Sequence, residues 1–202
     1  MKAGIVGILI VGMLVAGCVA EKHVEQKTAP PTVTQVPTTQ RPDHEMRTLE
    51  VQPTIEYYPL GGYTGEGEEA LYILSGDAST IKKSLEALVT GKAPPTTIFR
   101  EDEILNLVVF RGVFSTGGHG IEIGKVEKAG NTFVVYATYT DPGKGMMVTQ
   151  AFTQPTAIIL IGELPKGNYE AKLKVTSIVK EEGGDKILEE NKEHASVAFA
   201  VK

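Results

Sequence analysis

One glycine-rich stretch of the sequence brings together residue types that could do chemistry. The segment "FSTGGHGIEI" (114–123) holds His119 beside several glycines, and "DPGKG" (141–145) supplies Asp141 as a carboxylate that could pair with it. A histidine can transfer protons, bind a metal ion or simply lie in a turn. Clustered glycines permit positive φ and expose backbone N–H groups. The stretch therefore predicts either a tight reversal or a loop that the main chain of a partner approaches closely.

Beyond His119 and Asp141, the sequence shows neither the nucleophile motif of a hydrolase nor a set of metal ligands. It contains no Gly-x-Ser-x-Gly motif, and its single cysteine is Cys18. Only His119 and His194 lie in the part that we expect to fold, with no Cys or His at ligand spacing beside them. We therefore expect no catalytic residue, no metal site and no cofactor, and we interpret the protein as a non-enzyme.

Composition limits the domain number and the classes of partner. A chain of 202 residues with 42% hydrophobic and 22% charged residues can build one globular core with appendages. The formal net charge is −5, and the basic side chains are scattered along the chain. Nucleic-acid binders gather basic residues on one face, so we expect no nucleic-acid partner.

The N-terminus has the pattern of an export signal. An uninterrupted apolar run (5–16) leads into Gly17 and Cys18, and it is shorter than the roughly 20 residues that a membrane-spanning helix needs. The sequence "VAGC" (15–18) resembles the lipobox of prokaryotic lipoproteins. We predict a lipoprotein signal peptide (1–17) and lipidation of Cys18, which would hold the protein on the extracytoplasmic face of the cell membrane. An uncleaved anchor or a merely buried cysteine are the alternatives.

A composition change separates this signal from the folded part. The stretch "TAPPTVTQVPTTQRP" (28–42) is rich in Thr and Pro and has no apolar periodicity. Such a sequence buries too little surface to offset its ordering entropy. We predict a disordered tether over 18–54 and a folded domain over 55–202.

The pattern within 55–202 is mainly β. A short strand at 70–76 precedes one amphipathic helix at 77–92, with Asp77 or Ser79 as its N-cap and Gly91 at its end. From 103 to 202 about seven β-rich segments alternate with turn sequences. This spacing predicts an antiparallel Ig-like β-sandwich or a related barrel. The expected strands are 104–112, 119–128, 132–140, 146–152, 156–164, 169–180 and 194–202.

Three turn sequences are candidates for a binding surface at one end of the sandwich. We expect the loops around Gly118, Gly143 and Pro155 to gather there and to contact a protein partner. Local chemistry also allows "DPGKG" to be only a hairpin turn and "TQP" (153–155) only an edge-strand break. The candidate protein-binding residues are Thr116, Gly117, Gly118, His119, Asp141, Pro142, Gly143, Gly145, Thr153, Gln154 and Pro155.

Residues 105–161 resemble the PrcB C-terminal domain family of exported proteins. The matching elements are "STGGHGIEI" (115–123), a following strand pair, and "DPGKGMMVTQAFTQP" (141–155) before an apolar strand. That family is named for a subunit of a bacterial surface protease complex, so the resemblance implies a role beside a protease. The three loops resemble chagasin-type protease inhibitors more weakly, with His119 standing where that family has an aromatic residue.

These observations predict a lipid-anchored, noncatalytic, protein-binding module at the cell surface, with a surface protease as the partner that the resemblance implies. Two alternatives stay open. One is a lipoprotein that binds carbohydrate or another small solute, although the absence of Trp removes the usual sugar platform. The other is a purely structural envelope protein.

Overall fold

The computed structural model describes residues 47–49, 54–57 and 68–202. The predicted signal peptide, Cys18 and most of the predicted tether lie outside the described residues. Within them, no helix is long and apolar enough to cross a membrane. The elements are β1 (Arg47–Leu49), β2 (Thr54–Tyr57), β3 (Ala70–Ser75), α1 (Ala78–Val89), β4 (Ile98–Phe99), β5 (Leu105–Phe110), β6 (Gly120–Ala129), β7 (Thr132–Pro142), β8 (Pro155–Gly162), β9 (Gly167–Lys180) and β10 (Lys186–Val201).

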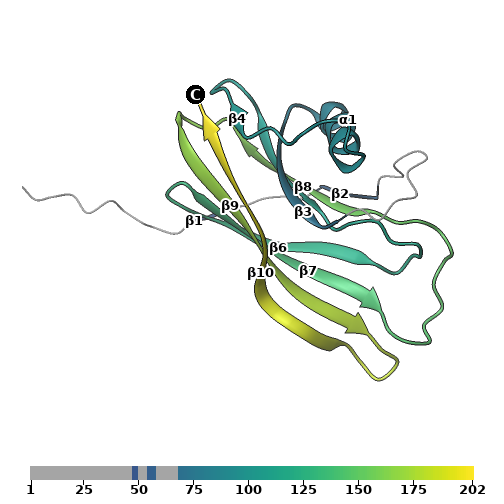
Figure 1. Ribbon diagram of the computed structural model, residues 1–202. Coiled ribbons are helices and arrows are strands. Elements are labelled where there is room, and N and C mark those ends of the chain that lie inside the picture. The colour runs from purple at the N-terminus through teal and green to yellow at the C-terminus, as the bar shows by residue number, and fades with distance from the viewer. Residues whose placement is uncertain (1–46, 50–53, 58–67) are drawn as a thin grey trace, which may run out of the picture. The chain divides into compact units, whose positions relative to one another are not determined.

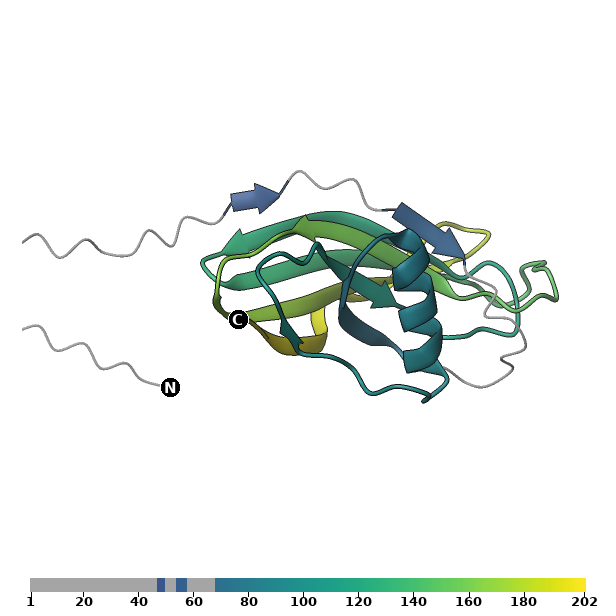
Figure 2. The same cartoon turned by 90° about the horizontal axis from the view of Figure 1, so that it is seen from above.

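The strands form two stacked sheets, with α1 on the outside of the smaller one (Figures 1 and 2). The six-stranded sheet has the order β1-β6-β7-β9-β10-β4, and the four-stranded sheet has the order β2-β8-β5-β3. The predicted β-sandwich with one helix is therefore confirmed, and the barrel alternative is not what the chain forms. Most pairs are antiparallel, but β7 with β9 and β4 with β10 run parallel.

The main core lies between the two sheets. On β7 every second residue faces inward and is buried, from Phe133 to Tyr139, which is the period that a half-buried strand requires. All six residues of β5 are buried, because the six-stranded sheet covers one of its faces and α1 covers the other. Leu107 accordingly belongs to the main core, while Val108 belongs to a second core beneath the helix.

Helix α1 lies within the predicted range 77–92 and has the predicted N-cap, Asp77. The Asp77 side chain accepts a hydrogen bond from the Thr80 backbone N–H at 2.8 Å, which satisfies one of the free donors of the first turn. Ile81 and Leu85 are the buried residues of the helix. Gly91 follows the last turn at φ +68°, a conformation that suits glycine.

The expected strand at 146–152 is wrong. This segment is part of an irregular connection between β7 and β8, and it belongs to no strand. An isolated bridge between Phe114 and Thr153 follows it. The reason is topological, since β7 belongs to the six-stranded sheet and β8 to the four-stranded one. The connection has to cross between the sheets, so "DPGKG" is not a hairpin turn. The segment 111–119 makes the corresponding crossing from β5 to β6.

Two further boundaries differ from the expected ones. β10 begins at Lys186 rather than near 194, because it continues a long hairpin with β9. Its exposed polar residues hide the alternation that marks a strand in sequence. β1 pairs with β6 from within the segment expected as tether. A short edge strand is held by backbone hydrogen bonds, so it needs no apolar pattern.

Candidate functional site

The two sheet-crossing segments lie side by side and are joined by backbone hydrogen bonds. The Phe114 and Thr153 backbones exchange two N–H···O bonds, each 2.9 Å long, and Gly117 N–H donates to Thr149 O at 2.9 Å. The Thr153 hydroxyl also donates to Thr116 O at 2.8 Å. We call residues 111–119 together with 141–155 the loop end. Its two halves are far apart in sequence, yet they form one braced unit.

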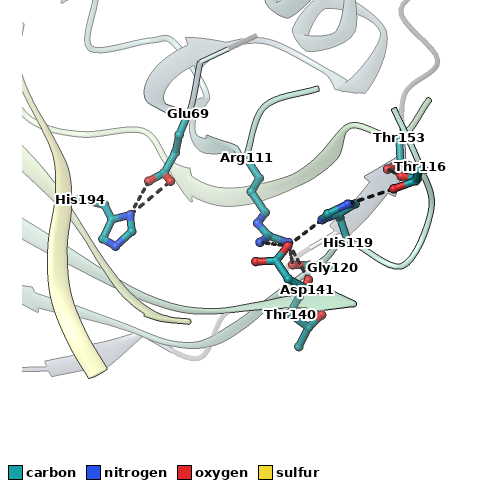
Figure 3. A network of polar contacts seen from close by, with 9 residues as sticks. All are labelled: Glu69, Arg111, Thr116, His119, Gly120, Thr140, Asp141, Thr153 and His194. Carbon is teal, nitrogen blue, oxygen red and sulfur yellow. Dashed lines mark hydrogen bonds and ion pairs between the residues drawn. The ribbon is translucent and has the colours of Figure 1, made fainter. Parts of the chain in front are cut away.

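His119 and Asp141 meet inside the loop end (Figure 3). The imidazole Nδ1 lies 2.6 Å from Asp141 Oδ1, and Nε2 lies 3.3 Å from the Thr116 hydroxyl oxygen. The His119 ring stacks on the Phe114 ring, with centroids 3.9 Å apart and planes 13° from parallel. The histidine is thus fixed by polar contacts at both nitrogens and by a ring against one face.

Arg111 is the buried centre of this network. Its side chain is only 5% exposed, and one guanidinium nitrogen lies 2.6 Å from Asp141 Oδ1. The other terminal nitrogen donates to Gly120 O at 2.8 Å and to Thr140 O at 2.7 Å. A buried charge is stable only when it is paired and hydrogen-bonded, and Arg111 meets both conditions. It therefore ties the end of β5 to the neighbouring ends of β6 and β7.

Close packing explains two of the glycines in the predicted loops. A Cβ on Gly117 would collide with the Thr149 hydroxyl, and one on Gly143 would collide with the Lys180 carbonyl oxygen, which accepts from Gly143 N–H at 2.8 Å. At Gly118 the reason is the backbone itself, because its φ of +87° is a conformation that residues with a Cβ rarely adopt. These glycines are required by the assembly of the loop end itself, whether or not a partner binds there.

The structure divides the eleven candidate loop residues by exposure. Gly118 and Gly145 are exposed, and Thr116, His119, Asp141, Pro142 and Thr153 are half-buried. Gly117, Gly143, Gln154 and Pro155 are buried. The buried members can support the shape of the loop end, but their side chains offer no contact surface.

Sequence reasoning missed the most exposed apolar side chains of the loop end. Met147 is fully exposed, and Met146 and Phe152 are exposed by 43% and 55%. Met146 and Met147 fall in the expected strand 146–152, which does not form. A run of Met-Met within a Gly- and Thr-rich segment was the available signal. Arg111 was also missed, although an arginine at the end of the apolar run "LNLVVF" (105–110) indicates a buried charge that needs partners.

Thr116, His119 and Asp141 stand in the order hydroxyl, imidazole, carboxylate, which hydrolases use to activate a nucleophile. Here the carboxylate oxygen that faces His119 is the same one that binds Arg111. The hydroxyl contact of 3.3 Å is long for an O–H···N hydrogen bond. The arrangement holds the imidazole in place and connects the two crossings.

His194 belongs to a separate polar cluster (Figure 3). Its Nδ1 lies 3.1 Å and 3.2 Å from the two Glu69 carboxylate oxygens, and its Nε2 lies 3.1 Å from Glu189. Hydrogen bonds from Lys192 and His194 lower the pKa of the Glu189 carboxyl. In the described part of the chain, no group of three His, Cys, Asp or Glu side chains is arranged to hold a metal ion.

Tyr139 lies between the two clusters. The Arg111 guanidinium lies 4.6 Å from its ring centroid, and its ring meets that of His194 edge-on at 6.1 Å. Its buried hydroxyl has no well-formed hydrogen bond within the described ranges. Burial, with a smaller contribution from the negative charge of Glu69, raises the pKa of this phenol.

These features define a two-sheet β-sandwich domain with one covering helix and a cross-braced loop end. Residues 105–161, which include the whole loop end and β5 to β8 except the last residue of β8, match the family model described as PrcB C-terminal. The match confirms the predicted family resemblance over this segment. It suggests association with a protease complex, and so a protein partner. Comparisons with curated proteins and with solved structures give no match.

Proposed function

We propose that this chain is a noncatalytic protein-binding module, a protease-associated subunit or modulator, that docks through its loop end. The observation that carries the proposal is the display of Met146, Met147 and Phe152 on a connection that is fixed to its neighbour. Large apolar side chains that stay exposed on one ordered connection favour contact with another protein. The family match favours a protease complex as the place of that contact.

The energetics of the loop end suit docking. Burying one Met or Phe side chain contributes about 1.5–3 kcal/mol, so three of them can supply the centre of an interface. The bonds between Phe114 and Thr153 and between Gly117 and Thr149 already order the loop in the free protein. A loop that is ordered beforehand loses less entropy on binding. Met side chains also adapt to irregular surfaces.

The proposal assigns a structural role to the His119 network. Asp141 is shared between His119 and the buried Arg111, so it neutralises a charge that would otherwise be costly. A nucleophile role for Thr116 would require a working proton transfer to His119. We therefore expect Thr116→Val to leave any associated proteolysis unchanged when the partner complex is intact, and complete loss of proteolysis would contradict the noncatalytic assignment.

Membrane anchoring through Cys18 is part of the same proposal. The support is the sequence alone, in which a short apolar run ends at "VAGC" (15–18). Mass spectrometry of the mature protein from membranes should find a lipid-modified Cys18 at the N-terminus. The Cys18→Ser variant should appear in the soluble fraction. An uncleaved N-terminal segment in the mature protein would rule out the lipid anchor at Cys18.

Docking is tested by crosslinking on intact cells and recovery of the tagged protein from membranes. The Met147→Ser and Phe152→Ser variants should lose a crosslinked protein that the wild type retains, and mass spectrometry should identify that protein as a protease or a protease-complex subunit. Leu188→Ser is the matched control, because Leu188 is 55% exposed but lies on β10, outside the loop end. Equal recovery by all four proteins would remove the loop end from the interface.

A further inference from the structure

A groove outside the loop end lies beside the first turn of α1. It is a hollow of about 680 Å³ between the helix, the segment before β5 and the end of β8, a volume within the range of ligand sites. The family segment begins at residue 105 and so excludes the helix. We call this hollow the helix groove. Its large apolar members are Ile81, Ile104, Ile158 and Leu160.

The helix groove exists because α1 covers only part of its sheet. Along β8, Ile158 faces the helix and is 8% exposed, whereas Leu160 has the same orientation two residues later and is 59% exposed. Ile104, just before β5, is exposed by 51%. Ile104 and Leu160 are thus large, exposed aliphatic side chains, and both line the hollow.

The walls of the groove are held in place by hydrogen bonds. Gly76 N–H donates to Ile104 O at 3.0 Å, and the buried Asn106 amide donates to Gly76 O at 3.2 Å. The capping bond between Asp77 and Thr80 fixes the first turn of the helix at 2.8 Å. The hollow is therefore a feature of ordered backbone, not of a mobile side chain.

The rim of the groove carries negative charge. Asp77, Asp102 and Glu103 line it, and no basic side chain is among its lining residues in the described ranges. Arg100, which is mostly exposed, contacts Asp102 at 3.1 Å and Glu103 at 3.7 Å and offsets part of that charge. Three carboxylates around an apolar floor are complementary to an apolar group flanked by cations.

The groove continues past the helix. A second hollow, of about 430 Å³, lies between α1 and the segment 93–99, and both hollows are lined by Ser75, Thr80 and Glu103. Lys83 also lines the second hollow, so the surplus of negative charge is confined to the helix groove. The two hollows thus abut at the first turn of the helix. Their combined extent suits an extended chain better than a compact solute.

We propose that the helix groove binds an extended segment of a partner protein in which a large aliphatic side chain is flanked by Lys or Arg. The aliphatic side chain lies against Ile104, Ile158 and Leu160, and the flanking cations face Asp102 and Glu103. This inference does not depend on docking through the loop end. It gives the module a second contact, on another part of the surface.

The test uses the full chain and two synthetic peptides, Lys-Lys-Leu-Val-Leu-Lys-Lys and Glu-Glu-Leu-Val-Leu-Glu-Glu, each with a fluorescent label. Fluorescence anisotropy should show saturable binding of the basic peptide only. Amide chemical-shift changes should map to residues 75–81 and 102–106. Leu160→Lys should weaken the binding at least tenfold, which corresponds to about 1.4 kcal/mol.

Leu188→Lys is the matched control, because Leu188 is 55% exposed and lies on β10, away from the groove lining. It should bind the basic peptide as the wild type does. The double variant Asp102→Asn with Glu103→Gln should weaken binding severalfold and reduce its salt dependence. If Leu160→Lys does not fold, Ile104→Lys provides the same comparison.

Several results would overturn the proposal. Equal affinity for both peptides would show that the carboxylate rim selects nothing. Failure of either peptide to bind would remove the proposed occupant. Shift changes confined to the loop end, or unchanged affinity in Leu160→Lys, would place the contact elsewhere. Because none of these variants touches Met147 or Phe152, the outcome is separate from that of the loop-end docking experiment.

Discussion

Arg111 and Asp141 form a 2.6 Å ion pair beneath the loop end, although they are 30 residues apart in sequence. The same carboxylate oxygen is 2.6 Å from the His119 ring. This shared contact connects the end of β5 to the end of β7 across the gap between the two sheets. It is the relationship on which the shape of the loop end depends most directly.

Replacing Arg111 by Met should destabilise the fold strongly. The change leaves Asp141 without its buried cation and removes the donors to Gly120 O and Thr140 O. Breaking one partner of a buried pair costs about 3–5 kcal/mol, which urea denaturation can measure. Arg100→Met is the control, because its exposed ion pairs should contribute about 1 kcal/mol or less. Similar losses in both variants would contradict a central role for Arg111.

Replacing Gly143 by Ala should disturb the contact between the β7–β8 connection and β9. The new Cβ would run into the Lys180 carbonyl oxygen, which is backbone and cannot rotate away. We expect a loss of about 1–3 kcal/mol, measured by thermal or urea unfolding. At Gly183 an added Cβ meets nothing within 4 Å, so Gly183→Ala should stay close to the wild type. A stable Gly143→Ala variant would show that this approach is not tight.

Replacing Tyr139 by Phe should keep or raise stability at neutral pH. The lost hydroxyl is buried without a well-formed hydrogen bond in the described part, and removing such a group removes a desolvation cost of about 1–3 kcal/mol. The gain should be smaller than that, since a cavity of one oxygen atom remains. A loss of more than about 1 kcal/mol would mean that the hydroxyl has a hydrogen-bonded partner that stabilises the fold.

The same variant should change the alkaline limit of stability. The pKa of Tyr139 is raised above its ordinary value of 10.0, mainly by burial. Below about pH 10 the phenol is protonated in both states, and its contribution is fully present. Above that pH the unfolded chain releases the proton while the folded chain keeps it, so stability falls by about 1.4 kcal/mol per pH unit for this group.

Urea denaturation between pH 8 and roughly pH 11 should therefore show a shallower decline for Tyr139→Phe than for the wild type. Tyr136→Phe is the comparison variant, because the Tyr136 hydroxyl is only partly buried and donates to Glu127 at 3.0 Å. It should keep most of the wild-type decline. Parallel profiles for all three proteins would contradict the burial of the Tyr139 phenol.

Replacing Thr153 by Val should loosen the brace between the two halves of the loop end. The variant keeps the side-chain shape but loses the hydroxyl bond to Thr116 O, which is expected to contribute about 1 kcal/mol. Hydrogen exchange should become faster at the Gly117 and Phe114 amides, which bond across the same gap. The exposed Thr97 supplies a control as Thr97→Val. Unchanged exchange in Thr153→Val would show that the backbone bonds alone hold the loops.

Much of the local structure could be predicted from residue types. The cap at Asp77, the buried Ile81 and Leu85, and the two-residue alternation of β7 depend on near neighbours in the chain. The strand expected at 146–152 is wrong for the same reason, because residues with strand propensity predict a strand locally. In the fold this segment crosses from one sheet to the other on the surface and joins neither. The alternation pattern also failed to predict the first half of β10, because most residues there are exposed and polar on both faces.

The β-sandwich class, the single helix and the glycine-bearing segments could be predicted from residue order, since each follows from short-range periodicity and turn chemistry. Three features could not: those segments cross between the sheets, His119 and Arg111 contact the same Asp141 oxygen, and Met147 and Leu160 stay uncovered. These facts depend on contacts between residues far apart in the chain. Such contacts are set by how the two sheets stack, and no local pattern encodes them.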